Sequence, residues 1–203
     1  DQGDDVVVPE PMYLTYEATI RAAGGRIIRV PMRPENEFHL DPADLEKAIT
    51  AKTKAIMFAT PSNPTGAMFS KDTLEAMAKL AMRHNLWVIC DEDYAALSFG
   101  KPHVSIAGLP GTAERAITIN SLSKSHAMTG WRVGWIVGPK ELIRFAHDLG
   151  LSTQYGLPGF IQRAATRALQ EPMPFVDEMR DAYRRRCNTA IQQLNQVPGL
   201  KVH

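Results

Sequence analysis

Short apolar runs alternate with longer amphipathic segments along almost the whole chain, and this alternation limits the possible folds more than any other feature. The apolar runs cover residues 6–8, 26–30, 54–59, 86–90, 116–119 and 133–137. The segments that we expect to be helical cover residues 13–23, 42–49, 140–149, 160–169 and 174–195, and a further helix begins after Ser70. Strands that alternate with helices predict an α/β fold with three layers, in which a mostly parallel sheet carries helices on both faces.

Local signals support several of these elements. Asp41 followed by Pro42 is typical of a helix N-cap with proline in the first turn. The helix after Ser70 has apolar residues at near-helical spacing. They are Leu74, Met77, Ala78, Leu80 and Ala81. The continuous apolar run 86–90 indicates a strand that is covered on both faces, which would bury Cys90.

Composition excludes several classes of function. The chain has 23 Lys and Arg against 22 Asp and Glu, and this balance is unlike the basic surface of a nucleic-acid or membrane-surface binder. The chain has no apolar run as long as the roughly 18 to 20 residues of a membrane span. The six histidines show no metal-ligand spacing, so we expect no metal site. Two distant cysteines, without a signal peptide, favour a reducing, cytoplasmic location.

Polar side chains follow three of the predicted strands. The loop 60–66 contains Asn63 between two prolines, and the run 86–90 is followed directly by Asp91 and Tyr94. The strand 116–119 is followed by a third group, which consists of Ser121, Ser123 and Lys124. In parallel sheets, ligands bind at the carboxyl ends of the strands, so these groups are expected at one edge. The chain lacks the glycine-rich phosphate loop of nucleotide hydrolases and the glycine fingerprint of dinucleotide-binding domains.

Taken together, these segments resemble one family. Residues 62–66 (SNPTG), 91–94 (DEDY) and 121–124 (SLSK), followed by 128–134 (MTGWRVG), are similar to the signatures of class I/II aminotransferases, in the same order. The spacing of eight residues between Lys124 and Arg132 is part of this pattern. The resemblance extends over essentially the whole chain. It implies the large domain of an aspartate-aminotransferase-like, fold-type I enzyme that depends on pyridoxal phosphate.

The resemblance also implies catalytic roles. Lys124 would form a Schiff base with the cofactor and then act as base and acid, which requires a lowered amine pKa. Asp91 would pair with the protonated ring nitrogen, so that the ring accepts electrons from the substrate. Asn63 and Tyr94 would hydrogen-bond the phenolic oxygen of the ring, and Tyr94 is counted among the catalytic residues.

The remaining cofactor-binding residues are implied in the same way. Ser121, Ser123 and Arg132 would hold the phosphate, because a guanidinium offers a planar fork to phosphate oxygens. Tyr13 lies where the family places an aromatic that stacks on the ring, and the alternative for Tyr13 is an ordinary core aromatic.

Neighbouring residues are expected to have structural roles. Trp131 and Trp135 are interpreted as core or interface aromatics, and His126 as a packing residue. Glu92 and Asp93 are expected to be solvated or to cap a turn.

The same resemblance indicates that both ends are cuts through a longer chain. Residues 1–197 would form the large, cofactor-binding domain without its phosphate loop, and residues 198–203 would begin a small domain that carries the arginine for the substrate carboxylate. A homodimer is implied, and these residues alone should bind cofactor weakly and catalyse little.

The substrate remains open. Residues 121–135 are similar both to arginine–pyruvate transaminases and to aspartate-type members. The leading interpretation is transfer of an amino group between an amino acid and a 2-oxo acid. A carbon–sulfur β-lyase of the same fold and an aminotransferase-like sensing domain of a transcription regulator are the alternatives.

Overall fold

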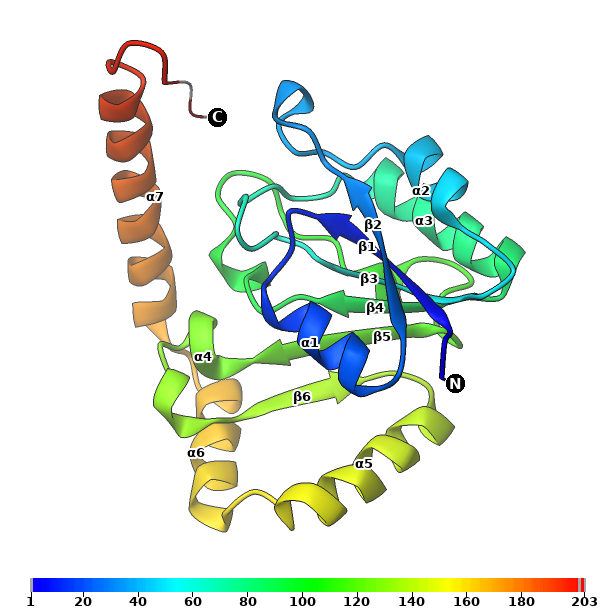
Figure 1. The fold of residues 1–203 in the computed structure, drawn as a ribbon. Coiled ribbons are helices and arrows are strands. Elements are labelled where there is room, and N and C mark those ends of the chain that lie inside the picture. Colours follow the sequence, from blue (N-terminus) through cyan, green and yellow to red (C-terminus); the bar gives the residue numbers. More distant parts are fainter. Residues whose placement is uncertain (1, 201, 203) are drawn as a thin grey trace.

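A six-stranded sheet forms the centre of the molecule (Figure 1). The computed structural model describes residues 2–200 and 202. The strands are β1 (Asp5–Glu10), β2 (Arg26–Pro31), β3 (Thr53–Ala59), β4 (Trp87–Asp91), β5 (Ala116–Ser121) and β6 (Gly134–Val137). Their order is β2-β1-β3-β4-β5-β6, and all neighbours are parallel except β6, which runs antiparallel to β5. The mostly parallel sheet that the sequence predicts is confirmed.

The helices follow the strands in the expected order. They are α1 (Thr15–Ala22), α2 (Pro42–Ala48), α3 (Lys71–His84), α4 (Leu122–Ser125), α5 (Lys140–Gln154), α6 (Gly159–Gln170) and α7 (Pro174–Leu194). Short 3-10 helices cover Pro34–Asn36, Ala95–Leu97, Ile106–Gly108 and Thr129–Trp131. Among the elements of the described residues, α4 and these 3-10 turns lack a counterpart in the sequence prediction.

Helices cover both faces of the sheet. Successive side chains of a strand point to opposite faces. Val7 of β1 accordingly packs in a cluster with Leu74 and Met77 of α3, whereas Val8 packs with Tyr16 of α1. Figure 1 shows α1 on one side of the strands and α2 with α3 on the other. The three-layer architecture is therefore confirmed.

The predicted helix signals are present. The Asp41 carboxylate accepts from the Ala43 amide at 2.8 Å, and the Ser70 hydroxyl accepts from the Thr73 amide at 3.1 Å. All the apolar residues predicted for the inner side of α3 are buried. Cys90 is also fully buried.

Among the described elements, β1 and α5 extend furthest beyond their predicted bounds. β1 continues through Pro9 to Glu10, beyond the predicted run 6–8. Pairing with β3 stops at Val7, and from there β1 pairs only with β2, so the N–H that Pro9 lacks removes no bond to β3. α5 extends past Gly150 to Gln154, because a single glycine inside a helix costs only about 1 kcal/mol.

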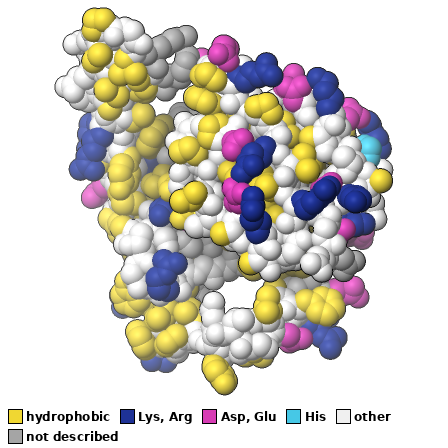
Figure 2. Space-filling model, viewed as in Figure 1, with side chains coloured by type: hydrophobic (Ala, Val, Ile, Leu, Met, Phe, Trp, Pro, Cys, Tyr) yellow, Lys and Arg dark blue, Asp and Glu magenta, His cyan; other side chains and the backbone are white. Residues whose placement is uncertain are grey.

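The helices after β6 are the least buried. α6 packs through Ala165 and Ala168 against Leu122, but α5 and α7 bury no residue. Phe145 is 74% exposed and Tyr155 is 92% exposed. Figure 2 shows hydrophobic side chains on the outer surface over α6 and the end of α7, and an opening between α5 and the sheet. The predicted domain boundary near residue 198 stays a prediction.

The structure places Trp131, Trp135 and His126 close to their expected roles. Trp135 packs on the small cluster around Leu122, and Trp131 is 43% exposed. His126 lies against the Phe175 ring and within hydrogen-bond distance of the Ala168 carbonyl, as a packing residue should. Within the described residues, no helix has the length and apolar character needed to cross a bilayer.

Candidate active site

The carboxyl ends of β3, β4 and β5 lie side by side and carry the predicted site residues. In the sheet register, Asp91 at the end of β4 pairs with Ala59 of β3 and with Ile119 of β5. The loop with Asn63, the segment from Asp91 to Tyr94 and the turn with Lys124 therefore leave the same edge of the sheet, as the sequence predicts.

Lys124 is placed by a short helix that starts where β5 ends. The Ser121 hydroxyl caps α4 by accepting from the Ser123 amide at 2.9 Å, which gives the first turn a hydrogen-bond partner. Leu122 is fully buried and anchors the helix. The turn consequently points Lys124 into a cavity, where its Nζ lies 5.7 Å from the centre of the Tyr94 ring.

Both carboxylate oxygens of Asp91 have donors. Oδ2 accepts from the Tyr16 hydroxyl at 2.7 Å, and Oδ1 accepts from the Asp93 amide at 3.0 Å. Burial disfavours the phenolate of Tyr16, and the neighbouring Asp91 charge repels it, so the pKa of Tyr16 is raised. Tyr16 thus remains a donor across the neutral range, and the pair fixes the orientation of the carboxylate.

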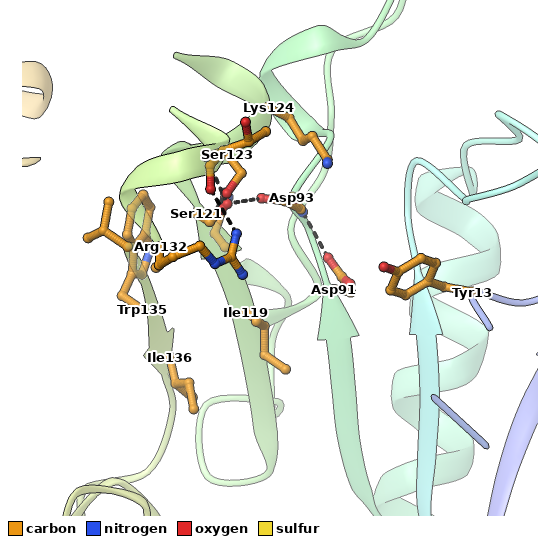
Figure 3. A pocket seen from close by; sticks show the side chains of 14 residues that line it. Tyr13, Asp91, Asp93, Ile119, Ser121, Ser123, Lys124, Arg132, Trp135 and Ile136 are labelled. Atoms are coloured by element: carbon orange, nitrogen blue, oxygen red, sulfur yellow. Dashed lines mark hydrogen bonds between the residues drawn. The ribbon is translucent and has the colours of Figure 1, made fainter. Parts of the chain in front are cut away.

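A cavity of about 510 Å³ brings most of the predicted residues together (Figure 3). Its lining includes Tyr13, Asp91, Ser121, Ser123, Lys124 and Arg132. Gly134 also lines it, and a Cβ at Gly134 would lie only 2.8 Å from the Asn120 carbonyl oxygen. Figure 3 shows Arg132 extending toward Ser121 and Ser123 at one end, with Asp91 and Tyr13 across the opening. One end is thus rich in donors, and the other carries an acid.

Asn63 and Tyr94 line an adjoining cavity of about 740 Å³. The two cavities share Lys124 and Ser123. A small pocket of about 90 Å³ at their junction is lined by Lys124, Asp91, Asn63, Tyr94 and Tyr13 together. Every predicted site residue therefore lines at least one of three cavities, and Lys124 lines all three.

Arg132 is held in an unusual backbone conformation. Its φ is 50°, in the left-handed region, directly after the 3-10 turn Thr129–Trp131. Its guanidinium Nη1 donates to the Thr129 carbonyl at 2.8 Å. This turn directs the side chain back over the end of β5, so the cation reaches the donor-rich end of the cavity.

Comparison with known proteins assigns the chain to a family. All residues from 1 to 203 match the family described as aminotransferase class I and II. The chain belongs to the class I and II aminotransferases. It is 51% identical over 199 residues to an arginine–pyruvate transaminase of Pseudomonas aeruginosa, covering 98% of this chain and 51% of that protein.

Solved aminotransferase structures share the fold closely. A Thermus thermophilus aspartate aminotransferase with maleate is 36% identical with a TM-score of 0.94, and the match covers 97% of this chain and 52% of that one. An aspartate aminotransferase of Geobacillus stearothermophilus is 37% identical over 201 residues, with 98% of this chain and 51% of that protein covered. The chain thus spans about half the length of the curated relatives that it matches.

The sequence analysis did not assign Tyr16 to the site. Tyr16 was predicted only as part of a helix, yet it is 6% exposed and holds Asp91. A tyrosine one helical turn after Tyr13 on the same side of the segment was the available signal, because residues three apart on a helix share a face.

The expectation of a solvated or capping side chain was wrong for Glu92, and it did not include the place of Asp93 in the cavity. Glu92 is buried, and its Oε2 lies 3.6 Å from Nε2 of His103. Asp93 is half-buried, lines the main cavity and accepts a hydrogen bond from the Ser121 hydroxyl. β4 ends at Asp91, and Glu92 and Asp93 follow in the turn that leads to the 3-10 helix Ala95–Leu97.

No group of three or more His, Cys, Asp or Glu in the described part of the chain could hold a metal ion.

Proposed function

We propose that this chain is the cofactor-binding part of a pyridoxal-phosphate-dependent aminotransferase, with Lys124, Asp91 and Tyr94 as its catalytic residues. The observation that carries the proposal is the convergence of Lys124 and Asp91 on one cavity whose far end is lined by Ser121 and Arg132. Family membership supports the same reaction class.

The residues of the cavity fit pyridoxal phosphate. Hydroxyls and a guanidinium at one end match a phosphate, and an acid held by two donors at the other matches a protonated ring nitrogen. Glycine at position 134 lets β6 lie close to the end of β5, because a Cβ there would lie 2.8 Å from the Asn120 carbonyl oxygen. When bound, the cofactor supplies an aldehyde that joins to the amine and a ring that accepts electrons.

The protein residues would then position and move protons. Lys124 Nζ would act as the base that takes the proton from the substrate α-carbon. It would then act as the acid that returns this proton during transfer of the amino group. The Asp91 carboxylate would hold a proton on the ring nitrogen. Asn63 and Tyr94 would donate to the ring hydroxyl. The phosphate would be held by Ser121, Ser123 and Arg132. Tyr13 would cover one face of the ring.

For substrates, we propose an amino acid and a 2-oxo acid. The arginine–pyruvate transaminase at 51% identity supports a basic amino-acid donor with pyruvate as acceptor, ahead of the aspartate aminotransferases at 37%.

A homodimer is part of the proposal. It is supported by the exposed apolar side chains along α5 and α6, such as Phe145, Leu149 and Phe160, because monomers rarely expose large apolar patches. Sedimentation of the intact protein tests it. The cytoplasmic location stays a prediction.

The absorption spectrum of the intact protein tests the function. After reconstitution with pyridoxal phosphate we expect a visible band that Lys124→Ala abolishes. Addition of arginine should shift the band, and pyruvate should restore it. Formation of pyruvate and ammonia without any 2-oxo acid would instead indicate the β-lyase. A protein that stays colourless after reconstitution with pyridoxal phosphate would contradict the proposal. Band formation with no turnover of any amino acid would favour the sensing domain.

A further inference from the structure

Asp93 puts a second carboxylate into the cavity, at the end where the donors lie. Its backbone amide supports Asp91, and its Oδ1 accepts a hydrogen bond from the Ser121 hydroxyl (Figure 3). The same cavity is lined by Arg132 and Ser123. The acid therefore sits among the groups assigned to the phosphate.

The hydrogen bonds of Ser121 conflict with its proposed role. A serine hydroxyl carries one proton. In this structure the proton goes to Asp93, and the oxygen accepts from the Ser123 amide at 2.9 Å. To donate to a phosphate, Ser121 must release Asp93, which leaves a half-buried carboxylate with one partner fewer and next to a new anion. Both effects oppose phosphate binding.

We propose that Asp93 weakens retention of the phosphorylated cofactor, by competing with the phosphate for the Ser121 proton and by charge repulsion. This inference rests on the proposed function, since it takes the ligand to be a phosphate monoester. Asp93 is then a residue of the cavity that lowers the affinity for the phosphorylated cofactor. The Arg132 guanidinium on the same cavity lining opposes it, so the affinity is set by the balance of the two.

Binding titrations on the intact apoprotein test the proposal. Asp93→Ala removes the charge and frees the Ser121 proton, whereas Asp93→Asn removes the charge but keeps an acceptor. We expect pyridoxal phosphate to bind Asp93→Ala roughly ten- to hundredfold more tightly than wild type, which is the range of one hydrogen bond to a charged group. Asp93→Asn should lie between the two. The dissociation constants come from the visible band as cofactor is added.

Two controls separate the effect from general changes. Pyridoxal, which lacks the phosphate, should bind all variants within about twofold of wild type, well below the effect of one hydrogen bond. Glu114→Gln removes an equal charge from an exposed side chain just before β5, at the opposite edge of the sheet, and should bind like wild type. In a Ser121→Ala background, Asp93→Ala should raise the affinity for pyridoxal phosphate by a smaller factor. Unchanged or weaker binding of pyridoxal phosphate by both Asp93 variants, or an equal gain for pyridoxal, overturns the proposal.

A melting-temperature measurement with inorganic phosphate does not depend on Schiff-base formation at Lys124. It therefore tests the role of Asp93 separately from the proposed function. Inorganic phosphate should raise the melting temperature of Asp93→Ala apoprotein more than that of wild type. If no protein forms a visible band but this difference is found, the proposed function fails and the role of Asp93 at an anion site stands. If bands form and phosphate stabilises both proteins equally, the role of Asp93 fails.

Discussion

Replacing Tyr16 with phenylalanine removes one hydroxyl from beneath the cavity and leaves the ring in place. The ring packs against Val8, Ile20 and Met57, and phenylalanine keeps that packing. The loss is the 2.7 Å hydrogen bond to Asp91. Hydrogen bonds to charged groups contribute about 1.5 to 3 kcal/mol. Asp91 is half-buried and keeps the Asp93 amide, so we expect the lower end, about 1.5 kcal/mol, as a fall in the free energy of unfolding.

The same hydrogen bond should also make the free energy of unfolding depend on pH in the alkaline range. An unfolded tyrosine loses its proton near pH 10. In the folded protein, burial and the Asp91 charge raise the pKa of Tyr16, so above about pH 10 the unfolded state binds fewer protons than the folded state. The Tyr16 contribution is complete below that pH and declines as pH rises, by up to about 1.4 kcal/mol per pH unit. The free energy of unfolding of Tyr16→Phe should therefore fall less steeply at alkaline pH than that of wild type.

Urea unfolding of the intact apoprotein at neutral pH and at several alkaline pH values measures both effects. Tyr13→Phe is the matched control, because it removes a hydroxyl from the neighbouring ring, 42% exposed and 5.7 Å away between ring centroids. It should change the free energy of unfolding by less than about 0.5 kcal/mol, as surface substitutions do. Equal stability of Tyr16→Phe and wild type, or the same alkaline slope in both, would refute the reasoning.

Three further changes have defined outcomes. Asp91→Ala should lower kcat of the holoenzyme by roughly two or more orders of magnitude, in the range of lost transition-state charge stabilisation, and wild-type turnover would remove Asp91 from its role. Gly134→Ala places a Cβ 2.8 Å from the Asn120 carbonyl, so urea unfolding should show a loss of roughly 1 to 3 kcal/mol, and no loss would mean that β6 moves freely. Ser70→Ala should lower the free energy of unfolding by about 1 kcal/mol through loss of the α3 cap, and Ser70→Asp should restore it.

Periodicity was sufficient to predict the layers of this fold because the core obeys it. The inner residues of α3 and the run 86–90 are buried as their spacing requires. Boundaries were harder, since they depend on pairing partners. Pro9 stays in β1 only because β3 no longer pairs with the strand there, and a sequence does not display where a neighbouring strand stops pairing.

The site was predictable where chemistry and sequence motif coincide, and it was missed where a contact crosses the fold. Lys124, Asp91 and Arg132 belong to recognisable segments, and they line one cavity. Tyr16 and Asp91 are 75 residues apart, and only the packing of α1 against the sheet brings them together. Asp93 looked like a solvated turn residue, because its partner Ser121 is 28 positions away on the next strand.

The antiparallel strand β6 explains why the cavity has a donor-rich end at all. The chain leaves β5 through the capped turn of α4, passes through the left-handed Arg132 and returns beside β5, where Gly134 pairs with Ser121. A parallel neighbour would begin at the far edge of the sheet and could not place its first residues against the end of β5. The reversal therefore brings Arg132, eight residues after Lys124, to the same opening as the lysine. It also leaves no room for a side chain at Gly134. The fixed spacing of the lysine and arginine in the sequence is thus a consequence of one turn and one reversed strand.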